Sequence, residues 1–206
     1  LMRPQTHVPL SAILLIVGAV LCFTLLDATV KALADRYPTP LLVWARYAVQ
    51  LLVILLWLLP RMGVGLLRTP RFRLQFVRAA ILPLSSLCFF SALRYLPLAE
   101  ATAINYATPV LVIILAVLFL GERMTRPRIA LVLAGIAGMF LIVRPGSVVF
   151  QGAALLALGS AVFYGTFQIL TRTLAGEDSR VLLFYPALVG TLMMTALLPW
   201  LGIGFE

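Results

Sequence analysis

The stretch at residues 98–120 reads LAEATAINYATPVLVIILAVLFL, and Glu100 is its only charged residue. A helix needs roughly 20 apolar residues to cross the hydrocarbon core of a bilayer. This stretch is long enough to do so as one helix. It therefore predicts a membrane-spanning segment and indicates the fold class to look for on either side.

Stretches of the same kind flank this segment. They occupy residues 9–33, 39–60 and 76–95 before it, and 128–144, 150–174 and 181–201 after it. Proline and glycine residues separate them, because proline lacks a backbone donor and glycine tolerates the left-handed conformation that ends many helices. The chain is therefore predicted to be an all-α integral membrane protein with seven transmembrane helices.

The composition supports a chain that faces lipid. Hydrophobic residues make up 63% of the 206 residues and charged residues 11%, against roughly 45–50% and about 25% in ordinary globular chains. This excludes soluble, disordered and disulfide-rich proteins. Cys22 and Cys88 lie inside apolar runs, so neither a bridge nor a metal site is predicted, and no cofactor is expected. The net charge of +9 comes from arginines scattered between the spans. The expected partner is therefore the lipid bilayer and not nucleic acid.

The basic residues predict the orientation of the chain. With a cytoplasmic N-terminus, eleven basic residues lie in inner segments and four in outer segments, which is the usual positive-inside bias. The inner set is Arg3, Arg61, Arg68, Arg71, Arg73, Arg78, Arg123, Arg126, Arg128, Arg172 and Arg180, and the outer set is Lys31, Arg36, Arg94 and Arg144. The alternative role for the run from Arg61 to Arg78 is binding of acidic lipid headgroups.

The chain also contains a weak internal repeat. An offset of 141 residues aligns the first span with the sixth, so that Lys31 matches Arg172 and Asp27 matches Gln168. Five helices separate the two copies, and because this number is odd the second copy enters the membrane from the opposite face. Inverted repeats are typical of transporters with a site near the midplane. We expect a five-helix unit at 9–146 and an incomplete second unit at 150–206, so that the chain is a fragment of a ten-helix protein.

Three motifs resemble a known family. They are residues 91–104 (SALRYLPLAEATAI), residues 109–125, which end in LGERMT, and residues 135–146, which end in IVRPG. Together with Arg46 in the second span, they resemble the EamA-type domain of the drug/metabolite transporter superfamily. The resemblance covers residues 10–146 as one full unit and 150–201 as the start of a second.

The resemblance implies ten helices arranged as two inverted five-helix repeats around a central cavity, with both termini in the cytoplasm. It also implies movement of small metabolites across a bacterial inner membrane, often as efflux of amino acids or related compounds. This chain departs from the pattern because it lacks the last three helices.

Helix rise of about 1.5 Å per residue gives the depth of each polar side chain. This count brings hydroxyl, amide and aromatic groups to the midplane, where they could orient a small polar or amphipathic molecule. The candidate cavity residues are Thr24, Ser85, Ser86, Thr108, Phe163 and Tyr164, with Asn105 above them and Gln168 below. The alternative for each serine or threonine is a hydrogen bond to a carbonyl of its own helix.

Three charged residues are candidates for gating or coupling. Asp27 and Arg46 are predicted to pair across the first two helices, because a lone charge in the bilayer costs at least ~2.5–3.5 kcal/mol. This pair has either a structural or a gating role. Glu100 either stabilises the start of its helix or carries a proton. Lys31 is expected to reach water at the surface.

The leading functional prediction is a secondary carrier with alternating access that exports small metabolites, either coupled to protons or as a facilitator. An enzyme is not predicted, because His7 is the sole histidine and no metal-ligand cluster or nucleophile–base pair is evident. The remaining alternatives are a lipid flippase and a non-transporting membrane protein. A homodimer is a possible assembly.

Overall fold

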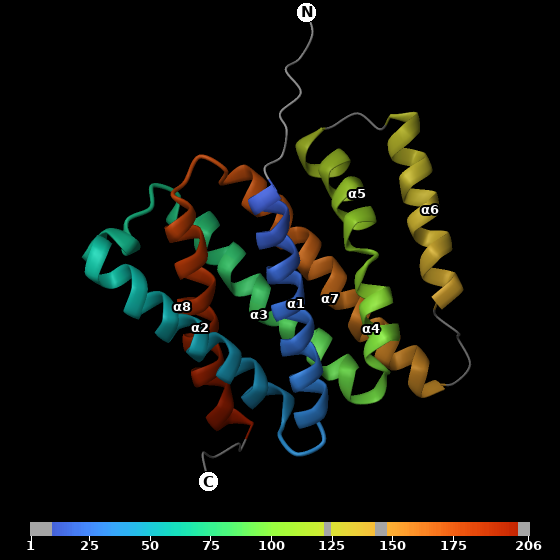
Figure 1. The fold of residues 1–206 in the computed structure, drawn as a ribbon, viewed down its shortest axis with the longest axis horizontal. Coiled ribbons are helices and arrows are strands. Elements are labelled where there is room, and N and C mark those ends of the chain that lie inside the picture. The colour runs from blue at the N-terminus through green and yellow to red at the C-terminus, as the bar shows by residue number, and fades with distance from the viewer. Residues whose placement is uncertain (1–9, 122–124, 143–147, 202–206) are drawn as a thin grey trace, which may run out of the picture.

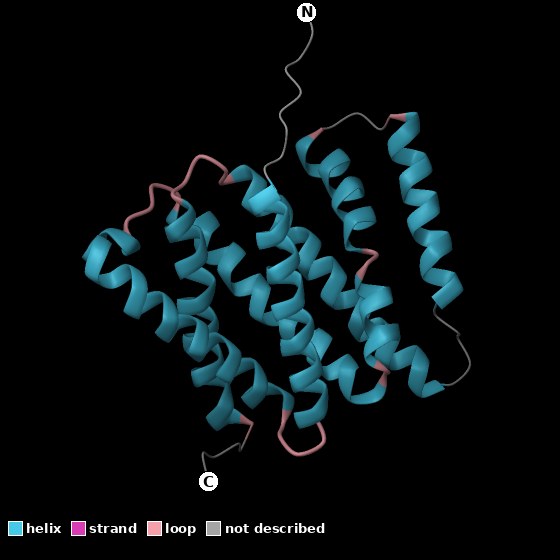
Figure 2. Cartoon of the chain, in the orientation of Figure 1, coloured by secondary structure: helices cyan, strands magenta, loops and turns pink. Residues whose placement is uncertain are grey.

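The computed structural model describes residues 10–121, 125–142 and 148–201. Within these ranges the chain consists of helices and connecting loops, without a strand (Figure 2). The α-helices are α1 (Leu10–Leu33), α2 (Thr39–Met62), α3 (Phe72–Tyr95), α4 (Leu98–Asn105), α5 (Thr108–Leu120), α6 (Arg126–Ile142), α7 (Val148–Thr173) and α8 (Ser179–Trp200), and a 3-10 helix, η1 (Gly63–Leu67), follows α2. The all-α fold class is confirmed.

Within the described residues, six segments are long and apolar enough to cross a membrane, with α4 and α5 together making one of them. The remaining predicted span, at 128–144, corresponds to α6, which has 17 residues and is therefore about 25 Å long. It was also the shortest of the spans expected from the sequence. The predicted span boundaries agree with the helix ends to within a few residues.

Residues 98–120 form one segment of membrane-spanning length, as predicted, but the helix within it is interrupted. The chain breaks at Tyr106 and Ala107, between α4 and α5. Pro109 explains the break, because its ring clashes with the carbonyl of Asn105 and it has no N–H to offer that carbonyl. The Thr108 hydroxyl donates to the Asn105 carbonyl instead, at 2.7 Å. Side-chain donors of this kind allow prolines inside membrane helices.

Helix α3 is the central element of the bundle. It contacts α7, α8, α2, α4 and α1, whereas α6 contacts α5 and α4. In Figure 1 α1 lies across the front of α3, and Val30 is the buried residue of α1. Gly190 of α8 is the most closely packed of the described glycines, because an added Cβ would lie 2.7 Å from the Tyr47 ring and 3.1 Å from Pro83 Cγ.

Seven of the described arginines lie at one end of the bundle, which we call the basic end. It contains the α2–α3 connection and the α7–α8 turn, both at the top of Figure 1, while the α1–α2 turn lies at the opposite end. The described basic-end residues are Arg61, Arg68, Arg71, Arg73, Arg126, Arg172 and Arg180. The bias expected from the sequence is thus present in the fold, and the cytoplasmic location of this end stays a prediction.

The α1–α2 and α7–α8 junctions have the same length. Helix α1 ends at Leu33 and α2 begins at Thr39, while α7 ends at Thr173 and α8 begins at Ser179. Leu42 N–H donates to Pro38, and Leu182 N–H donates to Asp178 in the same way. These positions differ by 140 residues and not by 141. With the offset of 140 residues given by the junctions, Lys31 matches Thr171. The offset of 141 predicted from the sequence matched Lys31 with Arg172 instead.

Candidate functional site

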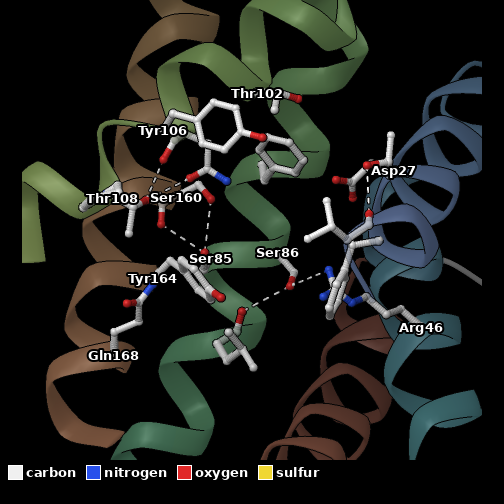
Figure 3. Close-up of a pocket in the computed structure, with 17 residues that line it drawn as sticks. Asp27, Arg46, Ser85, Ser86, Thr102, Tyr106, Thr108, Ser160, Tyr164 and Gln168 are labelled. Carbon is white, nitrogen blue, oxygen red and sulfur yellow. Dashed lines mark hydrogen bonds between the residues drawn. The ribbon is translucent and has the colours of Figure 1, made fainter. Parts of the chain in front are cut away.

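A cavity of about 400 Å³ lies in the middle of the bundle, between α1, α2, α3, α7 and the α4–α5 break. Figure 3 shows Asp27 and Arg46 on one side of it, Tyr164 and Gln168 on the other, and the α3 serines between them. The lining residues are Val20, Phe23, Thr24, Asp27, Arg46, Leu82, Ser85, Ser86, Phe89, Thr102, Asn105, Tyr106, Thr108, Pro109, Ser160, Tyr164 and Gln168.

The structure brings seven of the eight candidate cavity residues together. They are Thr24, Ser85, Ser86, Asn105, Thr108, Tyr164 and Gln168. Phe163 does not line the cavity, because one helical position turns its side chain about 100° away from that of Tyr164. Whether these residues bind a substrate stays a prediction.

The serines of α3 fasten the cavity wall to its neighbours. The Ser85 hydroxyl donates to the Ser160 carbonyl of α7 at 3.0 Å, and the two serine hydroxyls lie 3.1 Å apart. Ser86 Oγ lies 2.9 Å from the Tyr47 hydroxyl of α2 and 3.2 Å from the Leu82 carbonyl of its own helix, to which it donates. Part of the polar lining therefore joins helices.

Other hydroxyls in the cavity bind carbonyls of their own segment, as the alternative interpretation expected. Thr24 donates to Val20 at 2.9 Å, one turn earlier in α1. Thr108 donates to the Asn105 carbonyl and also lies 3.4 Å from the Asn105 side-chain oxygen. The α4–α5 break thus places an amide and a hydroxyl next to each other on the cavity wall.

The predicted ion pair between Asp27 and Arg46 is not formed as a direct contact, although the two charges interact electrostatically. Both residues line the cavity, but no hydrogen bond or ion pair joins Asp27 to any residue that the structure describes. Arg46 Nη1 instead lies 3.5 Å from Ser86 Oγ, and its Cζ atom is 5.7 Å from the Tyr47 ring and 5.6 Å from the Phe90 ring. Two opposite charges therefore share one cavity and interact electrostatically without a direct contact.

Lys31 has a different role from the expected one. Its ammonium group, one turn beyond Asp27 in α1, donates to the carbonyls of Leu93 and Leu96 at the end of α3. The last carbonyls of a helix lack helical donors and carry partial negative charge, so they attract a cation. The Lys31 ammonium group therefore binds the end of α3 and not the Asp27 carboxylate, which faces the cavity.

Glu100 lies outside the cavity. It is half-buried in the first turn of α4 and is not among the lining residues. This position agrees with stabilisation of the helix start, where a carboxylate is favourable. A role as proton carrier would have to operate at a distance from the cavity.

Helical spacing would have found several of the lining residues that the sequence analysis missed. Val20 precedes Thr24 by one turn, and Ser160 precedes Tyr164 and Gln168 in the same way, so each set follows a stripe of period four. Phe23 precedes Asp27 and Phe89 follows Ser85 at the same spacing, so helical spacing indicates these aromatic residues as well. Among the described residues no group of three or more His, Cys, Asp or Glu could hold a metal ion.

Comparison with known proteins identifies the family. The EamA-like transporter family matches residues 10–144. One solved crystal structure shares the fold with a TM-score of 0.62, at 23% identity over 85% of this chain and 63% of the other.

Three named relatives are transporters. The pseudopaline exporter CntI of Pseudomonas aeruginosa (strain UCBPP-PA14) is 33% identical over 91% of this chain and 66% of its own length. A riboflavin transporter of Brucella anthropi is 28% identical over 82% and 59%, and an S-adenosylmethionine uptake transporter of Rickettsia conorii is 25% identical over 66% and 47%. The chain thus spans less than two thirds of the length of these relatives. It is an integral membrane protein that belongs to the EamA-like transporter family.

Proposed function

We propose that this chain forms the substrate path of a secondary transporter that exports small polar metabolites from a bacterial cell. The observation that carries the proposal is a cavity of about 400 Å³ with polar lining inside an apolar helical bundle. That volume is within the range of small-molecule sites. The protein acts by alternating access in the inner membrane, with the basic end in the cytoplasm, and is not an enzyme.

The substrate class follows from two opposite charges that line the cavity without a direct contact between them. A charge within the bilayer is costly without a partner or water, and Asp27 and Arg46 face one cavity without bonding to each other. A metabolite with an ammonium group and a carboxylate, such as an amino acid, satisfies both. The similarity to an exporter supports outward movement.

Three small molecules with the same phenylethyl group test this charge preference. L-phenylalanine carries both charges, phenethylamine carries the ammonium alone, and 3-phenylpropanoate carries the carboxylate alone. We expect phenylalanine to raise the thermal unfolding midpoint of the purified complete gene product most, because ligands that bind the folded state stabilise it. Liposomes that contain the protein are expected to take up labelled phenylalanine in exchange for unlabelled phenylalanine inside.

Charge-removing variants then assign each group. Arg46→Gln is expected to reduce the phenylalanine response to that of phenethylamine, and Asp27→Asn to that of 3-phenylpropanoate. The matched controls are Arg94→Gln and Asp35→Asn, which alter exposed residues outside the cavity. If all three molecules act equally on the parent protein, the substrate class is wrong.

The competing functions give different results in the same liposomes. A flippase would move a fluorescent phospholipid between leaflets, and a non-transporting protein would move neither solute nor lipid.

Proton coupling is tested by imposing a pH gradient and comparing the parent with Glu100→Gln. We expect the gradient to drive uptake by the parent only if a titratable group is coupled, and an equal response of the variant would exclude Glu100.

A further inference from the structure

Arg78 is a buried cation whose partners come from three helices. It lies on α3, is 3% exposed, and donates from Nε to the Thr171 hydroxyl of α7 at 2.7 Å. Its Nη1 donates to Gln75 Oε1 at 2.9 Å, and Nη1 and Nη2 reach the Leu182 carbonyl of α8 at 3.2 and 3.3 Å. Its Cζ atom lies 4.5 Å from the Phe167 ring. Among the described residues its hydrogen-bond partners are all neutral.

The bond to Leu182 replaces a missing helical one. Pro186 lies four residues after Leu182 inside α8, and proline has no N–H for the carbonyl at that distance. An unsatisfied carbonyl in a nonaqueous interior is costly. The Arg78 guanidinium supplies the donors from another helix, so the first part of α8 depends on a side chain of α3.

An aromatic stack connects Arg78 with the cavity. The Phe167 ring beneath its guanidinium lies 6.0 Å from the Tyr164 ring, and the two ring planes differ by 12°. Tyr164 and Gln168 line the cavity. Arg78 therefore contacts the continuation of the α7 wall of the cavity toward the basic end.

Further bonds attach the α7–α8 turn to the α2–α3 connection. Arg71 Nη1 donates to the Thr173 carbonyl at 3.0 Å, and the Thr69 hydroxyl donates to Glu177 Oε2 at 3.2 Å. The Tyr185 hydroxyl donates to the Leu67 carbonyl at 2.9 Å. These bonds end at Tyr185, the residue before Pro186, so the fastened segment is 171–185.

The arrangement of side chains around Arg78 does not satisfy every buried donor. Gln75 is fully buried, and its Nε2 atom has no partner among the described residues. A buried unpaired donor costs about 1–3 kcal/mol. Opening this region to water would satisfy it, which lowers the cost of separating Arg78 from Leu182.

We propose that Arg78 is a latch that holds the basic end of the cavity closed and releases the Leu182 carbonyl when that end opens. Pro186 is the hinge of this movement, because its nitrogen cannot donate to the Leu182 carbonyl and one helical hydrogen bond is therefore missing there. This inference rests on the alternating access proposed above. The test below measures access to the cavity without requiring transport, so its failure differs from failure of the transport assay.

The experiment places a single thiol in the cavity. In the complete gene product, Cys22→Ser and Cys88→Ser remove the cysteines of this chain, and Gln168→Cys provides the reporter. A charged, membrane-impermeant methanethiosulfonate is added to right-side-out or inverted membrane vesicles. We expect Arg78→Gln to raise the labelling rate about tenfold, equivalent to about 1.4 kcal/mol, from the side that the basic end faces. From the other side the rate stays the same.

Two comparisons separate a latch from general loosening. Arg73→Gln removes an exposed basic-end arginine of α3 that makes no hydrogen bond or ion pair with the residues that the structure describes, and it should leave both labelling rates unchanged. Pro186→Ala gives Leu182 a donor in its own helix, so Arg78→Gln should add less to the labelling rate in that background than in the parent.

Three results would overturn the latch: no change for a folded Arg78→Gln variant, an equal rise from both sides, or an undiminished effect in the Pro186→Ala background. If Arg78→Gln does not fold, Arg78→Lys takes its place. Lysine retains the charge but lacks the planar fork, and a smaller one-sided rise is expected, with no rise counting against the latch.

Discussion

Pro109 and Pro186 each leave a carbonyl without its helical donor, as other prolines inside these helices do, and the chain satisfies these two carbonyls differently. At Pro109 the donor is the adjacent Thr108 hydroxyl, which binds Asn105 within the same segment. At Pro186 the donor is Arg78 of another helix, which binds Leu182. The substitution within one segment, at Pro109, coincides with the interruption between α4 and α5 and contributes to the cavity wall. The substitution from another helix, at Pro186, leaves α8 as one helix that depends on the Arg78 side chain of α3.

The largest expected effect is at the remote site. Arg78→Gln should lower the free energy of unfolding by about 3 kcal/mol, because bonds to a charged donor are lost and the Leu182 carbonyl is left unpaired. Reversible unfolding in mixed detergent micelles measures it. The exposed Arg73→Gln variant is the control, with an expected change within about 0.5 kcal/mol. Equal losses for the two variants would contradict a special role for the buried arginine.

A smaller effect is expected at the local site. Thr108→Val removes the hydroxyl without changing the shape of the side chain, and should cost about 1 kcal/mol in the same unfolding assay. Thr29→Val is the matched control, because the Thr29 hydroxyl also binds a carbonyl of its own helix, that of Leu25, but in an uninterrupted part of α1. A loss as large for Thr29→Val would show that Pro109 is irrelevant.

The smallest effect sharpens the comparison. Pro109→Ala gives Asn105 a backbone donor, so Thr108→Val in that background should cost only about 0.3 kcal/mol, less than a typical hydrogen bond. Unfolding of the four proteins of this double-mutant cycle measures the coupling between the two residues. If the two costs simply add, the Thr108 hydroxyl does not substitute for the missing N–H.

Hydropathy alone predicted the helices, because only long apolar segments cross lipid and each one satisfies its backbone internally. It failed at residues 106–107, where one proline within an apolar run changes hydropathy little and helix geometry strongly. Depth counting found most of the cavity lining because rise along a helix is regular. It misplaced Phe163 because depth does not specify which way a side chain points.

The charged residues were the hardest to predict. The pairing of Asp27 with Arg46 ignored competition from neutral partners, and the carbonyls at the end of α3 likewise bind Lys31. Arg78 was predicted to be a topology arginine, because its partners Thr171 and Leu182 lie 93 and 104 residues away in the sequence. Such dependence on tertiary contacts has no local signature in the sequence.

The close packing at Gly190 fixes the position of that point of α8 against α2 and α3. With the Tyr47 ring and Pro83 packed where a Cβ would stand, the middle of the helix has no room to slide inward. Leu182 lies eight residues from Gly190, about 12 Å along α8, and Pro186 stands between them. A bend at Pro186 therefore lifts the arm that carries Leu182 from Arg78 without moving the helix at Gly190. The arm on the other side carries Thr195, whose hydroxyl accepts from the Trp44 indole at 2.8 Å, so the bend leaves the contact of α8 with α2 in place.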